Sequence, residues 1–179
     1  MKESIPSEKQ PEYEAISSEI LKMASIDQQA RQKGNQEETE TIDQENQQRL
    51  KQIIASHGWP TKSKVGEEAS HMAWLILQHA DNDPEFQRIA FDAMREAGEK
   101  EVSLEDMAYL ADRIRVNEGR PQLFGTQWKI DSDQGYMPEE IEDPDRLDER
   151  RSQAGMEPFD QYATAIREMY EKWQVSKNQ

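Results

Sequence analysis

The chain has 179 residues, of which 34% are hydrophobic, and it carries a formal net charge of -15. This length suits one ordinary domain with short extensions. Because 37 acidic residues outnumber 22 basic ones, the chain should repel nucleic-acid phosphates and anionic membrane surfaces, so we expect neither as a partner. The absence of cysteine excludes disulfides, thiolate catalysis and cysteine-ligated zinc.

The N-terminal sequence MKESIPSEKQ lacks the apolar stretch of a secretory signal, and no run of eighteen apolar residues occurs. A soluble, cytoplasmic protein is therefore expected. Since apolar residues are scarce, they must be concentrated in particular elements if a core is to form.

Helical spacing of apolar residues begins close to the N-terminus. It predicts a helix at about 11–32, and residues 33–41 then read as a polar, exposed connection. A second helix should end at Gly58, because glycine followed by proline is a usual stop signal. A third helix at about 65–80 is apolar almost all round, which is typical of a central, buried helix.

Two further helices carry clear start signals. Asp83 and Pro84 predict one that runs to about Ala97, and Ser103 with Asp106 resembles a capping box ahead of the next. After Pro121 the pattern changes, and residues 121–138 can form a short β-hairpin. Asp143-Pro144 and then Pro158 mark two later helix starts.

Together these elements predict an all-α fold of about six to seven helices. We expect a single helical domain at residues 11–174, with a flexible tail at 1–10 and a short one at 175–179.

The three histidines, His57, His71 and His79, fall within one short region around the most apolar helix. His57 and His79 each follow a predicted helix end, where unpaired carbonyls stabilise a cationic imidazole. Either could act as a general acid or base, with a carboxylate such as Asp81 to orient it. Either could equally bond only the helix-terminal carbonyls, and the sequence leaves both interpretations open.

Helical spacing argues against a metal site made by histidines. His71 and His79 stand about two turns apart, roughly 12 Å along a straight helix, so one ion cannot bind both. Neither HExxH nor another compact ligand spacing occurs. We therefore predict no metal and no other cofactor, and we interpret His71 as a packing residue.

A second group of polar residues follows the helix that begins near Ser103. Arg113 could hold a carboxylate or phosphate group if it shares a cavity with His79 and Gln127. The alternative is that Arg113 pairs with Asp112 or Glu118 on the surface, while Gln127 bonds strand backbone. Both interpretations are consistent with the sequence.

Four motifs give the chain a specific likeness. They are HGWP at His57–Pro60, the WLxxQHAD helix end at Trp74–Asp81, a helix related to LAYLxDR at Leu104–Arg113, and GTQ at Gly125–Gln127. With these, and with Asp27-Gln28 and Arg31, the chain resembles an uncharacterised bacterial protein family. The resemblance spans most of residues 19–170 and implies one family domain with no established activity.

The leading hypothesis is a helical domain with one polar pocket that performs hydrolase or transferase chemistry on a small polar or anionic ligand. The predicted catalytic residues are His57, His79 and Arg113. The predicted ligand-binding residues are Gln28, Arg31, Trp59, Gln78, Asn117, Gln122, Thr126 and Gln127.

The alternative hypothesis is a non-catalytic module that binds a ligand or a basic protein partner. The net charge and the acidic stretch from Glu139 to Glu149 favour it. The sequence does not predict an oligomeric state.

Overall fold

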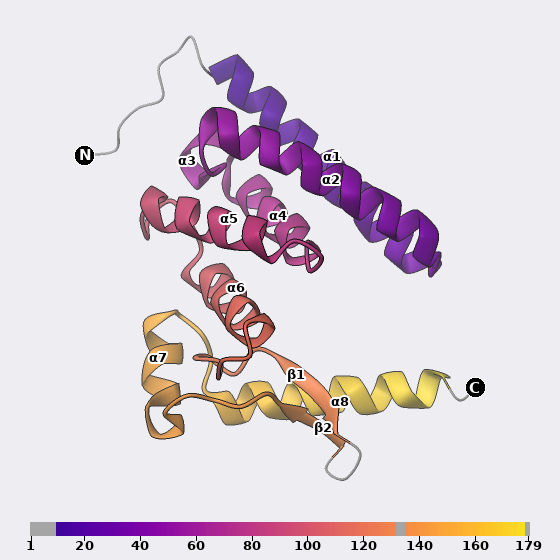
Figure 1. Ribbon diagram of the computed structural model, residues 1–179, viewed down its shortest axis with the longest axis vertical. Helices are drawn as coiled ribbons and strands as arrows, with labels where there is room; N and C mark the ends of the chain where they lie inside the picture. The colour runs from indigo at the N-terminus through magenta and orange to yellow at the C-terminus, as the bar shows by residue number, and fades with distance from the viewer. Residues whose placement is uncertain (1–9, 132–134, 178–179) are drawn as a thin grey trace. The chain divides into compact units, whose positions relative to one another are not determined.

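A computed structural model describes residues 10–131 and 135–177, and within these ranges the chain is mainly helical with one small hairpin (Figure 1). The predicted all-α fold with a short hairpin is confirmed. The chain forms two compact units, Met1–Asp106 and Met107–Gln179. The single domain predicted at residues 11–174 covers both units and stays a prediction.

The first unit is built on two long helices that lie side by side. Helix α1 (Gln10–Lys33) and helix α2 (Gln36–His57) are joined by Gly34 and Asn35 and pack against each other in opposite directions (Figure 1). Ile20 on α1 and Leu50 on α2 are fully buried. Apolar contact between the two helices therefore fixes which of their polar residues can meet.

Residues 33–41 are mostly exposed, as predicted, but most of them begin a helix instead of forming a connection. Helix α2 begins at Gln36, because the Asn35 side chain accepts a hydrogen bond from the backbone N–H of Glu38. Glu37 and Glu38 in the first turn interact favourably with the helix dipole. This turn is mostly exposed, so it needs no apolar face and gives no apolar periodicity.

The helix predicted at 65–80 is α4 (Glu67–Gln78). It begins after Gly66, whose φ is 87° and which separates it from the short α3 (Lys62–Val65). Helix α4 packs on both α1 and α2, with Ala73 and Leu77 fully buried. The end of α4 thus comes to lie against the long helix pair, as a central helix should.

Helix α5 (Pro84–Ala97) contacts α2 and α4, and Asp83 caps its first turn as predicted, accepting a hydrogen bond from the backbone N–H of Phe86. Helix α6 (Leu104–Asn117) follows, and the Ser103 hydroxyl accepts from the backbone N–H of Asp106, as one half of a capping box would. The division between the two units falls within α6.

The second unit combines a small hairpin with the C-terminal helices. Strands β1 (Trp128–Asp131) and β2 (Gly135–Pro138) pair antiparallel, with Trp128 opposite Pro138. The 3-10 helix η2 (Pro144–Arg146), α7 (Leu147–Gln153) and α8 (Phe159–Lys177) follow. Trp128 packs near Phe159 and Tyr162, so the hairpin lies against the start of α8.

The described ranges contain eight α-helices rather than six to seven, since α3 and α7 are short and carry little periodicity. Helix α8 runs through Lys177, so residues 175–177 are helical and not a tail. Residues 1–9 and 178–179, which make up most of the predicted tails, lie outside the described residues. Among the described helices, none combines the length and apolarity needed to cross a membrane.

Candidate functional site

The first unit contains a buried carboxylate whose partners are all side chains. Asp27 lies near the end of α1 and is 1% exposed. Its oxygens accept hydrogen bonds from Nε of Arg31, at 3.1 and 3.3 Å, and from Nε2 of Gln28, at 2.9 Å. Arg31 stands four residues after Asp27, the spacing that places two side chains on one helix face.

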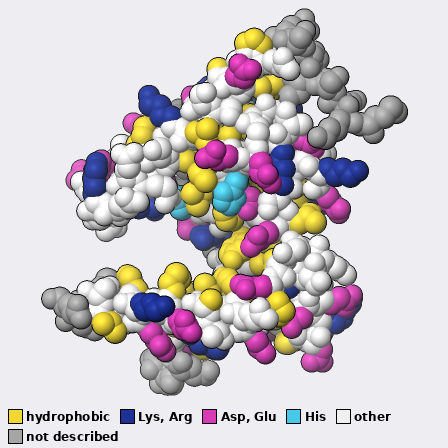
Figure 2. Space-filling view, turned by 180° about the vertical axis from the view of Figure 1, so that it is seen from behind, with side chains coloured by type: hydrophobic (Ala, Val, Ile, Leu, Met, Phe, Trp, Pro, Cys, Tyr) yellow, Lys and Arg dark blue, Asp and Glu magenta, His cyan; other side chains and the backbone are white. Residues whose placement is uncertain are grey.

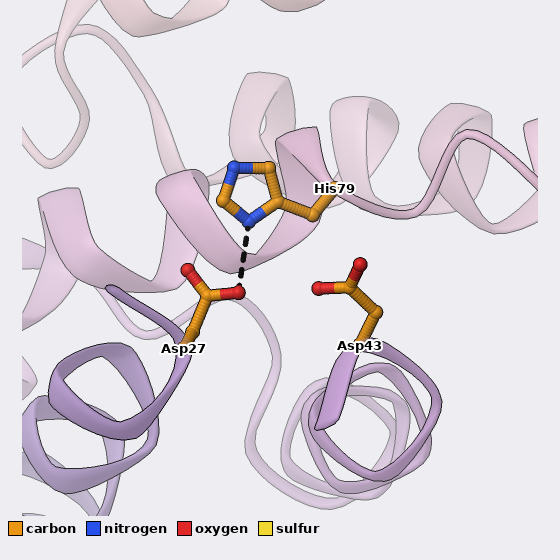
Figure 3. A group of neighbouring side chains, drawn as sticks. All are labelled: Asp27, Asp43 and His79. Carbon is orange, nitrogen blue, oxygen red and sulfur yellow. Dashed lines mark ion pairs between the residues drawn. The ribbon is translucent and has the colours of Figure 1, made fainter. Parts of the chain in front are cut away.

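Two other helices add an acid and an imidazole to this carboxylate (Figure 3). Asp43 of α2 places Oδ1 at 2.5 Å from the second terminal nitrogen of Arg31. His79 caps the C-terminus of α4, and its Nδ1 lies 3.2 Å from Oδ1 of Asp27. The structure thus pairs His79 with Asp27, while Asp81, which the sequence suggested as an orienting carboxylate, accepts a hydrogen bond from Gln87.

Within the described residues, Asp27, Asp43 and His79 form a compact set of potential metal ligands, which we call the DDH cluster. One ligand atom from each of them lies within 4.8 Å of the other two. Figure 3 shows one ring nitrogen of His79 facing Asp27, while the other lies on the far side of the ring from both carboxylates. The three side chains come together only because α1, α2 and the end of α4 pack against one another.

The two carboxyl groups of the DDH cluster differ in their acidity. Burial alone would raise the pKa of Asp27, but the hydrogen bond from Arg31 and the charges of His79 and Arg31 outweigh burial and lower it. Burial, opposed by the charge of Arg31 and assisted by the nearby Asp27, raises the pKa of Asp43. Arg31 thus stabilises the ionised form of Asp27 more than that of Asp43.

The structure does not bring His57 to this cluster. His57 ends α2, with Nε2 at 3.8 Å from Oε1 of Glu12 and its ring edge-on to Tyr13. Glu12 precedes Asp27 by fifteen residues on α1, which corresponds to roughly 22 Å along the helix. His57 and His79 therefore belong to opposite ends of the helix pair.

Other predicted residues of the first unit fall into two groups. Gln28 and Arg31 contact Asp27 directly and belong beside the cluster. Gln78 is buried in the last turn of α4, next to His79. Trp59 is 2% exposed and forms part of the core, which is the more common role of an aromatic residue in such a motif.

The prediction that His71 is a packing residue is wrong. Its side chain is 48% exposed, its ring stacks on Trp74, and Nδ1 lies 3.0 Å from Oδ2 of Asp106. Asp106 is nearly buried, and this burial raises its pKa against the lowering effect of His71. The His71–Asp106 pair provides two side chains that could ligate a metal, whereas the DDH cluster provides three.

The second unit has its own buried carboxylate, with different partners. Asp112 on α6 is fully buried. It accepts hydrogen bonds from the backbone N–H groups of Leu123, Phe124 and Thr126 and from the Thr126 hydroxyl. These bonds hold the loop that contains the GTQ motif against α6, so the geometry favours a structural role for Thr126.

The amide of Gln122 is also used within the loop. Its nitrogen donates to the carbonyls of Gln127 and Glu139, at 2.9 Å each, and its oxygen accepts from the backbone N–H of Gln127. The Gln127 side chain donates to the Thr126 hydroxyl at 3.1 Å. Gln122 is fully buried, so its polar atoms serve the loop in this structure.

Arg113 and Asn117 lie on the part of α6 that belongs to the second unit, Arg113 half-buried and Asn117 exposed. The predicted pocket would join them to residues of the first unit. That pocket, and the catalytic role predicted for Arg113, stay predictions.

The family model described as "Family of unknown function (DUF6624)" matches residues 14–174. The chain belongs to this family. No curated protein and no solved structure matches the chain. The DUF6624 match spans the DDH cluster and the loop held by Asp112 alike, so the family relationship covers both polar groups.

In this DUF6624 chain the acidic stretch at 139–149 is largely engaged in contacts of the second unit. Glu139 pairs with Lys129, Glu142 with Arg115 and Glu149 with Arg146, while Asp148 accepts from the backbone N–H of Phe159. Figure 2 shows acidic and basic side chains interspersed over one face of the molecule. A basic protein partner stays a prediction that rests on net charge.

Proposed function

We propose that the DDH cluster binds one divalent first-row transition-metal ion and uses it for hydrolytic or group-transfer chemistry on a small polar or anionic ligand. The observation that carries this proposal is the convergence of Asp27, Asp43 and His79, from three helices, to within 4.8 Å. The sequence had predicted no metal, because His71 and His79 stand too far apart to share an ion and no compact ligand spacing occurs.

The spacing suits coordination of a single ion. Donor atoms about 2.0–2.2 Å from a common ion lie about 3–4 Å from one another. Asp27 and His79 already have Oδ1 and Nδ1 at 3.2 Å. The third donor, Asp43, has a side chain that is 23% exposed, so small side-chain rotations can complete the set.

Charge also favours a cation. The two carboxylates outweigh the single guanidinium of Arg31, so the cluster with a neutral imidazole carries one net negative charge. The chain as a whole adds a net charge of -15. A cation is therefore attracted both locally and from a distance.

The donor set indicates the class of ion and of chemistry. One imidazole nitrogen with two carboxylate oxygens suits Zn²⁺, Mn²⁺, Fe²⁺ or Co²⁺. Three protein ligands leave coordination positions open for water and for a ligand oxygen, as catalytic sites do. An ion held in this way supplies Lewis-acid polarisation and lowers the pKa of bound water.

The test is isothermal titration of chelator-treated protein with Mn²⁺ and Zn²⁺. We expect one site in the wild type, and affinity lowered by at least about tenfold in Asp43→Asn and His79→Ala, since even partners of a ligand are worth that much. His71→Ala is the matched control, because it removes a histidine from the other histidine–aspartate pair.

Circular dichroism spectra would establish that each variant is folded. If metal binding were lost equally in His71→Ala, or were unchanged in both Asp43→Asn and His79→Ala, the DDH cluster would not be the binding site. A companion screen of small phosphate, ester and amide substrates should give turnover that requires both the metal and Asp43.

A further inference from the structure

Arg31 holds the position that a metal ion at the DDH cluster needs. One terminal nitrogen of its guanidinium lies 3.0 Å from Oδ1 of Asp27 and 2.5 Å from Oδ1 of Asp43. The same Oδ1 of Asp27 contacts His79. An ion bound to all three ligands must share these oxygens, so the terminal nitrogen of Arg31 has to move.

The geometry allows Arg31 to move without leaving the site. Its Nε also bonds the deeply buried Asp27, whereas its outer end bonds the partly exposed Asp43. The Arg31 side chain is 33% exposed, so its outer nitrogens can exchange a carboxylate for water at small desolvation cost. The flexible part of the contact is thus the one that faces the ion.

Binding of the ion also reverses the charge of the site. With a neutral imidazole, the two carboxylates of the metal-free site exceed the one guanidinium by one negative charge. A divalent ion adds two positive charges, which leaves one net positive charge. An oxyanion is therefore repelled before the ion binds and attracted afterwards.

We infer that Arg31 is an internal counter-ion that the metal displaces, and that the displaced guanidinium then holds an oxyanion of the ligand, a phosphate or carboxylate group. This inference rests on the proposed metal site. A guanidinium presents paired N–H donors that match two oxygens of such a group. Metal and anion would consequently bind in a fixed order, with the metal first.

The experiment measures two affinities in the wild type and in Arg31→Gln. The first is the affinity for Mn²⁺ alone. The second is the affinity of the Mn²⁺-loaded and the metal-free protein for two probes, methylphosphonate and acetate, which distinguish a phosphate-like from a carboxylate ligand. Arg49→Gln is the matched control, because Arg49 also joins α2 to α1 through an ion pair, with Glu19.

We expect Arg31→Gln to bind Mn²⁺ about tenfold more tightly than the wild type, because it lacks the competing charge-assisted bonds. It should also lose most of the probe binding that the Mn²⁺-loaded wild type shows. Arg49→Gln should leave both affinities unchanged, and Arg31→Lys should keep part of the competition but bind the probes more weakly.

The outcomes separate this inference from the proposed function. If neither wild type nor Arg31→Gln binds Mn²⁺, the metal site itself is wrong. If both bind it equally, or if Arg31→Gln binds it more weakly while remaining folded, displacement is wrong. If Arg31→Gln keeps full probe binding, or the metal-free wild type binds the probes equally well, the anion role of Arg31 is wrong.

Discussion

Asp27 in the first unit and Asp112 in the second are both nearly or fully buried carboxylates, yet their partners differ in kind. Asp112 accepts from three backbone N–H groups and one hydroxyl of a single loop. Asp27 is bonded or paired to the side chains of Gln28, Arg31 and His79. Each carboxylate is satisfied, as burial requires.

The difference determines what each group can do. Backbone donors are fixed by the fold, so a ligand cannot replace them without unfolding the loop. The side chains that contact Asp27 come from α1 and the end of α4 and can rotate, and one of them, Arg31, reaches the surface. We conclude that Asp112 stabilises the fold, while Asp27 belongs to a site that can accept an ion. The following changes should separate the two roles.

The largest effect is expected for Asp112→Ala. This change leaves several buried backbone donors without an acceptor, so we expect a loss of at least about 3 kcal/mol of unfolding free energy. Urea denaturation would measure it. Asp145→Ala, on an exposed acid of the same unit, should stay within about 0.5 kcal/mol of the wild type; equal losses would remove the special role of Asp112.

Gln122→Ala should follow, with a loss of about 2 kcal/mol, because its amide bonds the backbone at Gln127 and Glu139. Urea denaturation would measure this loss of unfolding free energy, and thermal unfolding would show the accompanying fall in Tm. A variant with wild-type stability and impaired ligand binding would contradict the structural role and would favour the ligand-binding role predicted from sequence.

Asp83 combines the two kinds of partner that Asp112 and Asp27 have separately. It accepts hydrogen bonds from the backbone N–H of Phe86 and from the side chains of Gln47 and Lys51. Asp83→Ala should cost about 1 kcal/mol as the loss of a helix cap. The hydrogen bonds from Lys51 and Phe86 lower the pKa of Asp83 below its ordinary 3.8. Its contribution is thus present at neutral pH and is lost as pH falls from 3.8 through the lowered value.

Urea denaturation of wild type and Asp83→Ala at pH 7 and near pH 3 would test this dependence. The difference between the two proteins should shrink at the lower pH. A difference that grew on acidification would show that the carboxylate is not stabilised in its ionised form.

Apart from the control Asp145→Ala, the smallest effect on stability is expected for Asp43→Asn. Its side chain is partly exposed and the amide keeps its shape, so the loss should stay within about 1 kcal/mol by urea denaturation. The same variant should lose metal binding. A large loss of stability would place Asp43 with Asp112 among structural carboxylates.

Sequence reasoning found the helix ends and two neighbours of the cluster. His79 was predicted at a helix terminus because apolar periodicity stops there, and the structure places it as the C-cap of α4. Gln28 and Arg31 came from the family resemblance, and both contact Asp27. Such features are local along the chain, so a sequence can display them.

Asp43 was missed because it is one of several acids in a polar stretch, and composition does not distinguish it. Only the antiparallel packing of α1 and α2 brings it to Arg31. The role of Asp112 was missed for another reason. Its partners are mainly backbone N–H groups, which nearly every residue possesses, so the side chains of the loop carry no signal of the contact.

The most direct test of the central claim is anomalous diffraction from crystals of the protein grown with Mn²⁺ or Zn²⁺. We predict a peak about 2.0–2.2 Å from a carboxylate oxygen of Asp27, one of Asp43 and Nδ1 of His79, with the outer nitrogen of Arg31 moved away. A fully occupied ion bound elsewhere, with the guanidinium of Arg31 still bridging the two carboxylates, would contradict the account.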